Sequence, residues 1–498
     1  RGLGDVYKRQ VWVHMNPIVI AVFDGLQPSQ VTSELMPNLF SWVQGGVTFN
    51  NNHPVFPSVT RINAATMVTG ASPGAHGLAA NNMVFREYDP YAAIPVLQPQ
   101  LVDIAAESGS ILKALTLADI LSLEGLEYTA VVSGTSGNAF VHNPNAGRNN
   151  GVIIHPEFTL PPELASDLSK RFGLWPQETL PNTPRVAHAA KILIDYILPE
   201  RNPDVALWWS SEPDKSQHAY GVGSSESNGA ILEADLQFKN ILEALNRKGV
   251  LASTDLFVLS DHGYSTIREV IQLEPLLKEA GFGDGDKPGG ISVAPNGGSA
   301  LFYAYGKDRL VCERLSEWLM VQPWCGSLIS SDSLGHIQGV LSASVCGCEG
   351  FRTPDLTMSF KWDSDLNDFG YRGHVYSTGG VVGQGTHGSM SKHELRNVLF
   401  ARGPSFKQEF ESNVPSGNID LAPTILRILG LQTSKHMSGR VLNESLVFNA
   451  DLEDKDWETE LYNAEKDLGD LVYRQQIKIS RVDETTYLDY GTNTLGPR

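Results

Sequence analysis

The chain is poor in cysteine, with four among 498 residues. They are Cys312, Cys325, Cys346 and Cys348. So low a content excludes a small scaffold held together by disulfides. Cys346 and Cys348 form a C-x-C pair, but no second thiol pair follows at zinc-finger spacing. We therefore expect free or locally bridged thiols rather than a cysteine-based metal site.

Long apolar runs are also missing. The longest run near the start covers residues 18–23 and is far too short to cross a bilayer, so we expect no transmembrane segment. The opening residues RGLGDVYKRQ do not begin with methionine and resemble translated sequencing-adapter sequence. We treat residues 1–14 as an unreliable leader, with Met15 as an alternative start, and leave any natural signal sequence open.

Basic residues are outnumbered by acidic ones. Lys and Arg total 38 against 56 Asp and Glu, which gives a formal net charge of −18. Such a chain repels nucleic acid and anionic membranes, so no bulk nucleic-acid binding is expected. An anionic substrate would need a local positive centre made of basic side chains or bound metal ions.

The apolar residues that are present, 41% of the chain, follow a repeating pattern. Short apolar runs that end in polar residues predict buried strands at 17–25, 205–214, 255–263 and 397–403. Helical periodicity appears between and after them, at 185–198, 227–249 and 418–431. This alternation predicts an α/β sandwich around a mostly parallel sheet. Ligands of such folds gather beyond the carboxyl ends of the strands, where Asp24, Asp214 and Asp261 would lie.

The periodicity weakens in one long segment. Residues 282–383 are richer in Gly and Ser and hold all four cysteines, so we expect an insertion or cap there. The core domain would then span residues 15–446. Residues 447–498 are charged and are predicted to form a C-terminal surface extension.

Three histidines accompany the three aspartates. His218 follows Asp214 by four residues, so on a helical turn both share one face. His262 follows Asp261 directly, and His387 lies close to glycines that let the backbone approach a ligand. Carboxylates and neutral imidazoles are good ligands for zinc and for other divalent transition metals. Six such side chains would serve two ions.

Thr60 lies where an extended segment is predicted to become a helix, with no charged partner beside it. A metal ion can activate such a hydroxyl, and two ions about 4 Å apart form the clamp used for in-line displacement at phosphorus. The Asn63 amide could donate to a phosphoryl oxygen. Alone, such a threonine is more often a helix N-cap and such an asparagine a capping or solvated amide. Together with the six ligands, they predict a hydrolase of phosphate esters.

Several motifs resemble, in the same order, those of the type I phosphodiesterase/nucleotide pyrophosphatase branch of the alkaline phosphatase superfamily. They are FDGL, FPSVTRIN…VTGASPGAHG, EPDKSQHAYG, SDHGYS and GTHGS, and the resemblance covers roughly residues 16–446. It implies an alkaline-phosphatase-like three-layer sandwich, with a mostly parallel central sheet flanked by helices and an inserted cap region. It also implies a small-molecule phosphate ester substrate and favours an extracytoplasmic location, periplasmic or secreted.

The resemblance further implies two divalent metal ions, with zinc favoured. One ion would be held by Asp214, His218 and His387, and the other by Asp24, Asp261, His262 and the Thr60 oxygen. Thr60 would be the nucleophile and would pass through a phospho-threonine intermediate, while Asn63 would hold a non-bridging oxygen.

Arg61 departs from the family pattern, in which nucleotide-cleaving members typically carry an aromatic residue after the nucleophile. Arginine can stack on a base, but it also suits a more highly charged phosphate, so Arg61 is a candidate substrate-binding residue. The leading hypothesis is a phosphodiesterase/nucleotide pyrophosphatase. A phosphomonoesterase or phosphonate hydrolase on the same scaffold is the alternative, and a metal-stabilised non-catalytic binding protein is the hypothesis of another class. The oligomeric state is left open.

Overall fold

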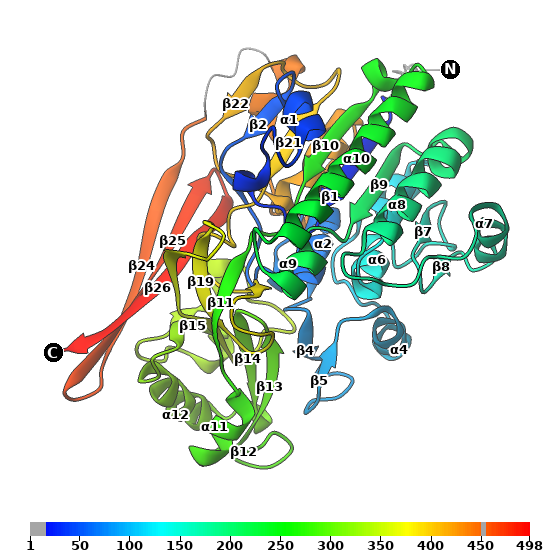
Figure 1. Cartoon of the computed structure of the whole chain (residues 1–498). Helices are drawn as coiled ribbons and strands as arrows, with labels where there is room; N and C mark the ends of the chain where they lie inside the picture. The colour runs from blue at the N-terminus through cyan, green and yellow to red at the C-terminus, as the bar shows by residue number, and fades with distance from the viewer. Residues whose placement is uncertain (1–15, 450–454) are drawn as a thin grey trace, which may run out of the picture.

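A computed structural model of the chain describes residues 16–449 and 455–498, so the predicted leader lies outside the described residues. Its centre is a nine-stranded sheet with helices on both faces (Figure 1). The strands lie in the order β22 (Phe410–Ser412), β2 (Val47–Phe49), β21 (Leu399–Arg402), β10 (Asp255–Leu259), β1 (Ile18–Phe23), β9 (Val205–Ser210), β6 (Tyr128–Val132), β7 (Val152–Ile154) and β8 (Thr159–Leu160).

The middle of this sheet is parallel. Strands β10, β1, β9, β6 and β7 run in one direction. The predicted strand at 397–403 is β21, which pairs antiparallel with β10. Because β1, β9 and β10 are adjacent and parallel, the polar residues that follow them emerge at the same edge of the sheet.

Both faces of the sheet are buried, as the continuous apolar runs predict. Alternate residues of β1 enter two separate cores. Helices packed on one core are α2 (Thr60–Thr69), α4 (Gln98–Ser108), α5 (Leu117–Leu123), α6 (Ser136–His142) and α13 (Leu421–Ile428). Those on the other are α1 (Pro37–Val43), α7 (Leu164–Phe172), α8 (Thr183–Ile192) and α10 (Ser225–Arg247). The predicted three-layer α/β sandwich is confirmed.

The three predicted helices are present with shifted ends. The pattern at 227–249 is α10, and the pattern at 418–431 is a short 3₁₀ turn, η7 (Asn418–Asp420), followed by α13. The pattern at 185–198 begins as α8 and continues as a π-helical segment, Leu193–Arg201. No strand is predicted at the residues of central strand β6. Its sequence YTAVV nevertheless contains β-branched and aromatic residues, which favour strands.

A second layered unit follows β10. Its six-stranded sheet has the order β12 (Gly283–Asp284), β13 (Gly290–Asn296), β14 (Ser299–Ala304), β17 (Leu356–Phe360), β15 (Cys325–Ser330) and β16 (Leu341–Ser342). Helices α11 (Leu273–Glu279) and α12 (Arg309–Met320) pack against it. A four-stranded sheet links this unit to the core through β18 (Trp362–Leu366), β19 (Arg372–Ser377), β11 (Ser265–Val270) and β20 (Gly385–Thr386).

The C-terminal residues form a long three-stranded antiparallel sheet, seen at the side of the molecule in Figure 1. Its strands are β24 (Glu458–Asp467), β25 (Leu471–Val482) and β26 (Thr485–Pro497). Tyr473 and Ile477 of β25 are fully buried, and the Tyr473 hydroxyl donates a hydrogen bond to the Gly326 carbonyl. The predicted division into a core domain, a cap and a C-terminal extension stays a prediction.

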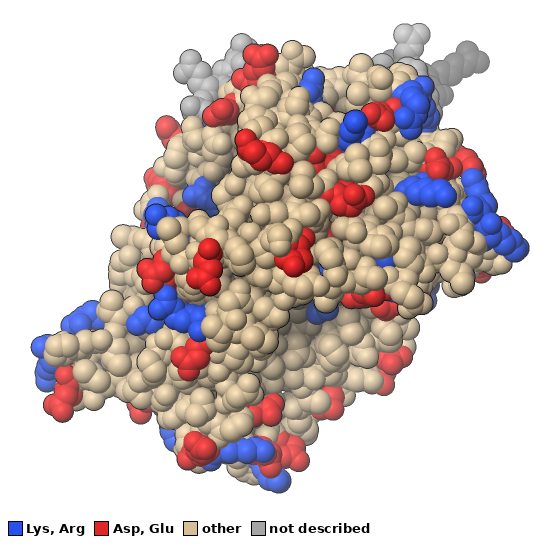
Figure 2. All heavy atoms as spheres, viewed as in Figure 1, with Lys and Arg blue, Asp and Glu red and all other residues tan. Residues whose placement is uncertain are grey.

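Shorter elements complete the described part of the chain. They are the pairs β4 (Asn82–Val84) with β5 (Ala93–Pro95) and β3 (Asn52–His53) with β23 (Ser416–Gly417), the helices α3 (Pro73–His76) and α9 (Asp214–Tyr220), and the 3₁₀ turns Pro28–Gln30, Leu251–Ser253, Tyr305–Lys307, Asp332–Leu334, Ala343–Cys346, Asn443–Ser445 and Val447–Asn449. The four cysteines are free thiols. Among the described residues, no helix has the length and apolar character needed to cross a membrane. Acidic and basic side chains are interspersed on the face shown in Figure 2.

Candidate active site

The predicted ligands meet beyond the carboxyl ends of three neighbouring strands. Asp24 directly follows β1, Asp261 comes two residues after β10, and Asp214 opens helix α9 after β9. Thr60 is the first residue of α2, and His387 follows β20. Segments up to 363 residues apart in sequence are thus brought to one edge of the central sheet, because parallel strands end together.

One group of ligands forms around His262. Its Nε2 atom lies 3.1 Å from Asp261 Oδ2, 3.7 Å from Asp24 Oδ1 and 3.3 Å from the Thr60 hydroxyl oxygen. Both carboxylates are buried, and these two oxygens have no hydrogen-bond partner among the described residues. A buried carboxylate oxygen without a donor is costly, so this arrangement suits a cation.

A second group forms around Asp214. Its Oδ1 atom lies 3.3 Å from His218 Nε2 and 3.5 Å from His387 Nε2. The two imidazole Nε2 atoms are themselves 3.1 Å apart. The ring of His387 also stacks on that of His262, with centroids 3.6 Å apart, so the two groups are contiguous.

Backbone carbonyls orient all three imidazoles in the same way. The Nδ1 atom of His218 lies 3.0 Å from the Gly385 oxygen, that of His262 lies 3.0 Å from the Gly263 oxygen, and that of His387 lies 2.7 Å from the Ser58 oxygen. A carbonyl can only accept, so in the neutral ring the proton is on Nδ1 and the Nε2 lone pair faces inward. This is the arrangement of metal-ligating histidines.

The electrostatics of the site also call for positive charge. Burial, together with the neighbouring Asp261 and Asp214 carboxylates, raises the pKa of Asp24 well above its usual value. Burial, reinforced by His262 and His218, lowers the pKa of His387 to about 4, so this ring is neutral at physiological pH. Three carboxylates and inward-facing lone pairs therefore fit divalent cations, which lower the cost of bringing them together.

Two aromatic residues that the sequence analysis left unassigned hold the aspartates. Trp209, the residue before the end of β9, donates from its indole nitrogen to Asp24 Oδ2 at 2.9 Å. Tyr264 donates from its hydroxyl to Asp214 Oδ1 at 2.7 Å. Trp209 is fully buried, as a residue of the core would be. No local pattern identifies these donors, since each contact joins separate strands or loops.

Asn63, which is predicted to bind a phosphoryl oxygen, makes other contacts in the structure, and that role stays a prediction. It is fully buried, and its side-chain oxygen accepts from the Val55 backbone at 2.9 Å and from the Asn418 amide at 3.1 Å. Its amide nitrogen donates to the Val59 carbonyl at 3.0 Å. Both ends of the side chain are therefore engaged in holding the turn that precedes α2.

Asn81 and Arg61, but not Asn63, are among the residues beside Thr60 in the nearest cavity. Both line a cavity of about 420 Å³ together with Thr60, Asp214, His218 and His387. Asn81 accepts from the Arg61 backbone at 2.8 Å through its side-chain oxygen, which leaves the amide nitrogen as a donor. The Arg61 guanidinium contacts the Thr135 hydroxyl and the Asn81 carbonyl at 3.3 and 3.1 Å.

Comparison with known families agrees with this geometry. A family model described as type I phosphodiesterase/nucleotide pyrophosphatase matches residues 18–319, which is more than half of the chain. The chain belongs to this family. The matched region contains six of the seven predicted metal ligands, and His387 lies beyond it.

The relatives within this family are distant. An ectonucleotide pyrophosphatase/phosphodiesterase of Caenorhabditis elegans is 22% identical over 469 residues, which cover 89% of this chain and 51% of the relative. Venom phosphodiesterase 2 of Crotalus adamanteus is 23% identical over 257 residues, which cover 51% of this chain and 27% of the relative. The chain thus spans about half of the nematode family member and about a quarter of the venom one.

Solved structures of the family share the fold. Murine ectonucleotide pyrophosphatase/phosphodiesterase 5, an inactive form in complex with AMP, superposes with a TM-score of 0.61 at 16% identity. The superposition covers 84% of this chain and 96% of the murine chain. The uncomplexed murine protein gives a TM-score of 0.60 at 17% identity.

We expect Trp209→Phe to weaken metal binding by about 10–100-fold, since Asp24 would lose the donor that orients it. Metal affinity is measured by competition with a chromogenic chelator on the folded protein. Trp208→Phe is the matched control, because Trp208 is equally buried but its indole nitrogen has no hydrogen-bond partner among the described residues. Equal affinities in the two variants would contradict the orienting role of Trp209.

Proposed function

We propose that this protein is a metal-dependent hydrolase of phosphate esters, of the phosphodiesterase/nucleotide pyrophosphatase type, with Thr60 as its nucleophile. The observation that carries the proposal is the position of the Thr60 hydroxyl. It lies 3.3 Å from His262 Nε2, at the mouth of a cavity and against two contiguous groups of carboxylates and imidazoles. The family to which the chain belongs supports the same chemistry.

Two divalent cations, with zinc favoured, would be held by the side chains described above. Asp214, His218 and His387 form one set of ligands, and Asp24, Asp261, His262 and Thr60 form the other. The contiguity of the two sets supports a paired site, and imidazole with carboxylate is a donor set that suits zinc. When bound, such ions supply Lewis acidity that lowers the pKa of the Thr60 hydroxyl and neutralises charge on the phosphoryl oxygens.

Thr60 would then perform a two-step displacement. Its Oγ1 atom gives its proton to solvent and forms a bond to phosphorus while the bond to the leaving oxygen breaks, and the leaving oxygen takes up a proton from solvent. This gives a phospho-threonine ester and the freed alcohol or nucleotide fragment. Water then attacks the same phosphorus, the ester bond to Thr60 breaks, and phosphate or a monoester leaves.

Asn81 is proposed to bind a non-bridging phosphoryl oxygen in place of Asn63. Asn81 lines the cavity beside Thr60, its oxygen is fixed by the Arg61 backbone N–H, and its amide nitrogen has no hydrogen-bond partner among the described residues. The N-terminus of α2 adds a favourable dipole, because Thr60 is the first residue of that helix. A donor fixed before the reaction stabilises developing charge without having to reorganise.

Arg61 favours a second candidate, a phosphomonoesterase or phosphonate hydrolase on the same scaffold. Burial lowers the pKa of Arg61 to about 10, so it stays protonated at neutral pH. Among the described residues that line the cavity there is no Phe, Tyr or Trp to stack on a nucleobase. A fixed guanidinium suits the extra negative charge of a monoester. An extracytoplasmic location stays a proposal, which the venom phosphodiesterases among the relatives support.

The nucleophile is tested with bis-p-nitrophenyl phosphate as substrate. We expect Thr60→Ala to lower kcat/KM by several orders of magnitude, because no other hydroxyl replaces the attacking oxygen. Removing metal with a chelator should abolish activity, and added zinc should restore it. Thr433→Ala, at an exposed threonine, is the control. Activity that survives both chelation and Thr60→Ala would end the proposal, and bound metal without turnover of any ester would favour a binding protein.

Asn81→Ala and Asn63→Ala separate binding of the phosphoryl group from support of the fold. Asn81→Ala should lower kcat by about 10²–10³-fold, as loss of an oxyanion donor does. Asn63→Ala should instead lower the free energy of unfolding by about 1–3 kcal/mol, because buried backbone groups lose their partners. Steady-state kinetics and chemical denaturation of both variants measure the two effects, and the opposite pattern would favour the phosphoryl-binding role predicted for Asn63.

Arg61 is expected to set the preference between monoesters and diesters. Arg61→Phe should lower kcat/KM for p-nitrophenyl phosphate by about tenfold, with a smaller effect on the bis-ester, because the lost charge serves the more anionic substrate. Arg61→Lys keeps the charge without the planar fork and should fall between the two. An unchanged ratio of the two kcat/KM values in Arg61→Phe would exclude Arg61 from substrate selection.

A further inference from the structure

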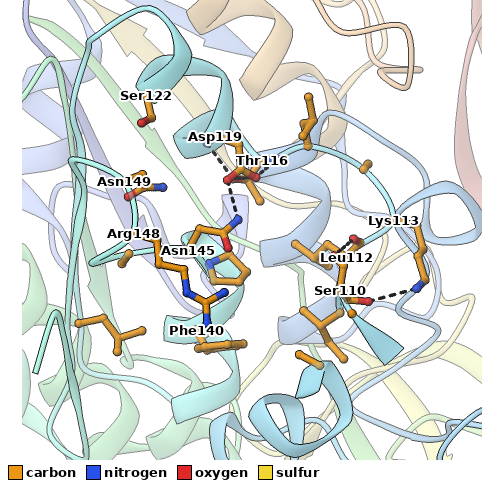
Figure 3. Close-up of a pocket in the computed structure, with 18 of the residues that line it drawn as sticks. Ser110, Leu112, Lys113, Thr116, Asp119, Ser122, Phe140, Asn145, Arg148 and Asn149 are labelled. Atoms are coloured by element: carbon orange, nitrogen blue, oxygen red, sulfur yellow. Dashed lines mark hydrogen bonds between the residues drawn. The ribbon is translucent and has the colours of Figure 1, made fainter. Parts of the chain in front are cut away.

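A larger cavity lies apart from the candidate active site. It measures about 740 Å³ and shares no lining residue with the cavity that contains Thr60. Its walls come from α4, α5 and the end of α6, with the loops 109–116 and 143–149 (Figure 3). This volume is within the range of about 300–1,000 Å³ that small-molecule sites occupy.

Apolar side chains make up much of the wall. Phe140 of α6 is almost fully buried there. Val102, Leu115 and Leu123 also line the cavity, yet they are 41%, 45% and 78% exposed. Single exposed aliphatic residues are common on proteins, but these three line one cavity, where a ligand would cover them.

Two cationic side chains reach the same cavity, Lys113 from one side and Arg148 from the other (Figure 3). Neither forms an ion pair with any described residue. Lys113 donates to the Ser110 carbonyl at 3.1 Å, and Arg148 extends toward Phe140. The Lys113 ammonium also lies 5.3 Å from the centre of the Phe351 ring. Two cations without a carboxylate partner among the described residues still contrast with the net charge of −18 of the whole chain.

Among the described residues that line the cavity, Asp119 carries the one carboxylate, and this group already accepts hydrogen bonds from its neighbours. Asp119 accepts hydrogen bonds from the Thr116 backbone and hydroxyl at 2.9 and 2.8 Å. It also accepts from the Asn145 amide at 2.9 Å. The carboxylate is thus held at the N-terminus of α5 and does not neutralise either cation.

We propose that this cavity binds an amphipathic organic anion, that is, an alkyl or aryl chain that carries a carboxylate or phosphate head. The chain would lie against Phe140 and Val102, where it covers apolar surface. The head would pair with the Arg148 guanidinium, whose planar fork matches both carboxylate and phosphate, while Lys113 on the other side adds to the positive potential of the cavity. This site is separate from the proposed hydrolase centre and does not depend on it.

The test is isothermal titration of the full-length chain with dodecanoate and dodecyl phosphate below their aggregation concentrations. Dodecyl maltoside and dodecyltrimethylammonium serve as neutral and cationic probes of the same chain length. We expect saturable binding of at least one anion at one site per chain, at least tenfold tighter than either other probe. The tighter anion identifies the head group. Absence of anion binding, or equal affinity for the neutral probe, would overturn the proposal.

Variants place the binding in this cavity. Lys113→Gln combined with Arg148→Gln should raise the Kd of the anion by at least tenfold, and Ala105→Trp should do the same by filling the cavity. Lys239→Gln combined with Arg247→Gln is the matched control, since both residues lie on α10, which covers the opposite face of the central sheet. Circular dichroism confirms folding. An unchanged Kd in both cavity variants, or an equal loss in the α10 control, would overturn the assignment.

Discussion

The gathering of three aspartates, two of them buried, at one edge of the sheet is the constraint on which the active site depends. Strands β1, β9 and β10 are adjacent and parallel, so Asp24, Asp214 and Asp261 emerge at one edge and cannot separate without breaking the sheet. Burial and the two neighbouring carboxylates raise the pKa of Asp24, which records the cost of this arrangement. Cations that bind only the folded state would offset that cost, so metal binding and folding stability are coupled.

Hydrogen bonds between the ligand residues and their neighbours hold the site in place. Each imidazole is fixed by a backbone carbonyl. The segment that carries Ser58 is fixed in turn by the buried Glu394, whose carboxylate accepts from the Ser58 hydroxyl at 3.1 Å. Asn418 donates to the Asp261 carbonyl at 2.7 Å and to the Asn63 side chain at 3.1 Å. Through Asn63, this network also supports the turn before α2. Asn63 thus contributes to the position of Thr60 without facing the cavity.

The convergence of the three aspartates can be predicted from a simple rule: polar residues that follow buried parallel strands meet at one edge of the sheet. The sequence predicts the partners of these ligands poorly. Asn63 stands one helical turn after Thr60, which makes it an attractive phosphate ligand, but its amide satisfies backbone groups of residues Val55 and Val59 that no spacing rule pairs with it. Asn81 lies 21 residues after Thr60, beyond α2 and α3, and reaches the cavity only through the path of that loop. Trp209 has the sequence context of a core residue, because its contact with the site is a single hydrogen bond from the indole nitrogen to Asp24.

Among the described residues, the side chains that line the cavity beside Thr60 include charged groups but no Phe, Tyr or Trp on which a base could stack. The Arg61 guanidinium is anchored at two nitrogens, by the Thr135 hydroxyl and the Asn81 carbonyl, so its orientation is fixed before a substrate arrives. Its pKa of about 10 keeps it charged, since Asp24 and Asp214 offset part of the effect of burial. Leu180 and Ala219 are the apolar side chains among the described residues that line this cavity, and neither offers a flat face to a base. A preorganised cation gains most from the phosphate that carries the most charge, which is the physical reason for proposing that Arg61 favours the phosphoryl group over a nucleobase.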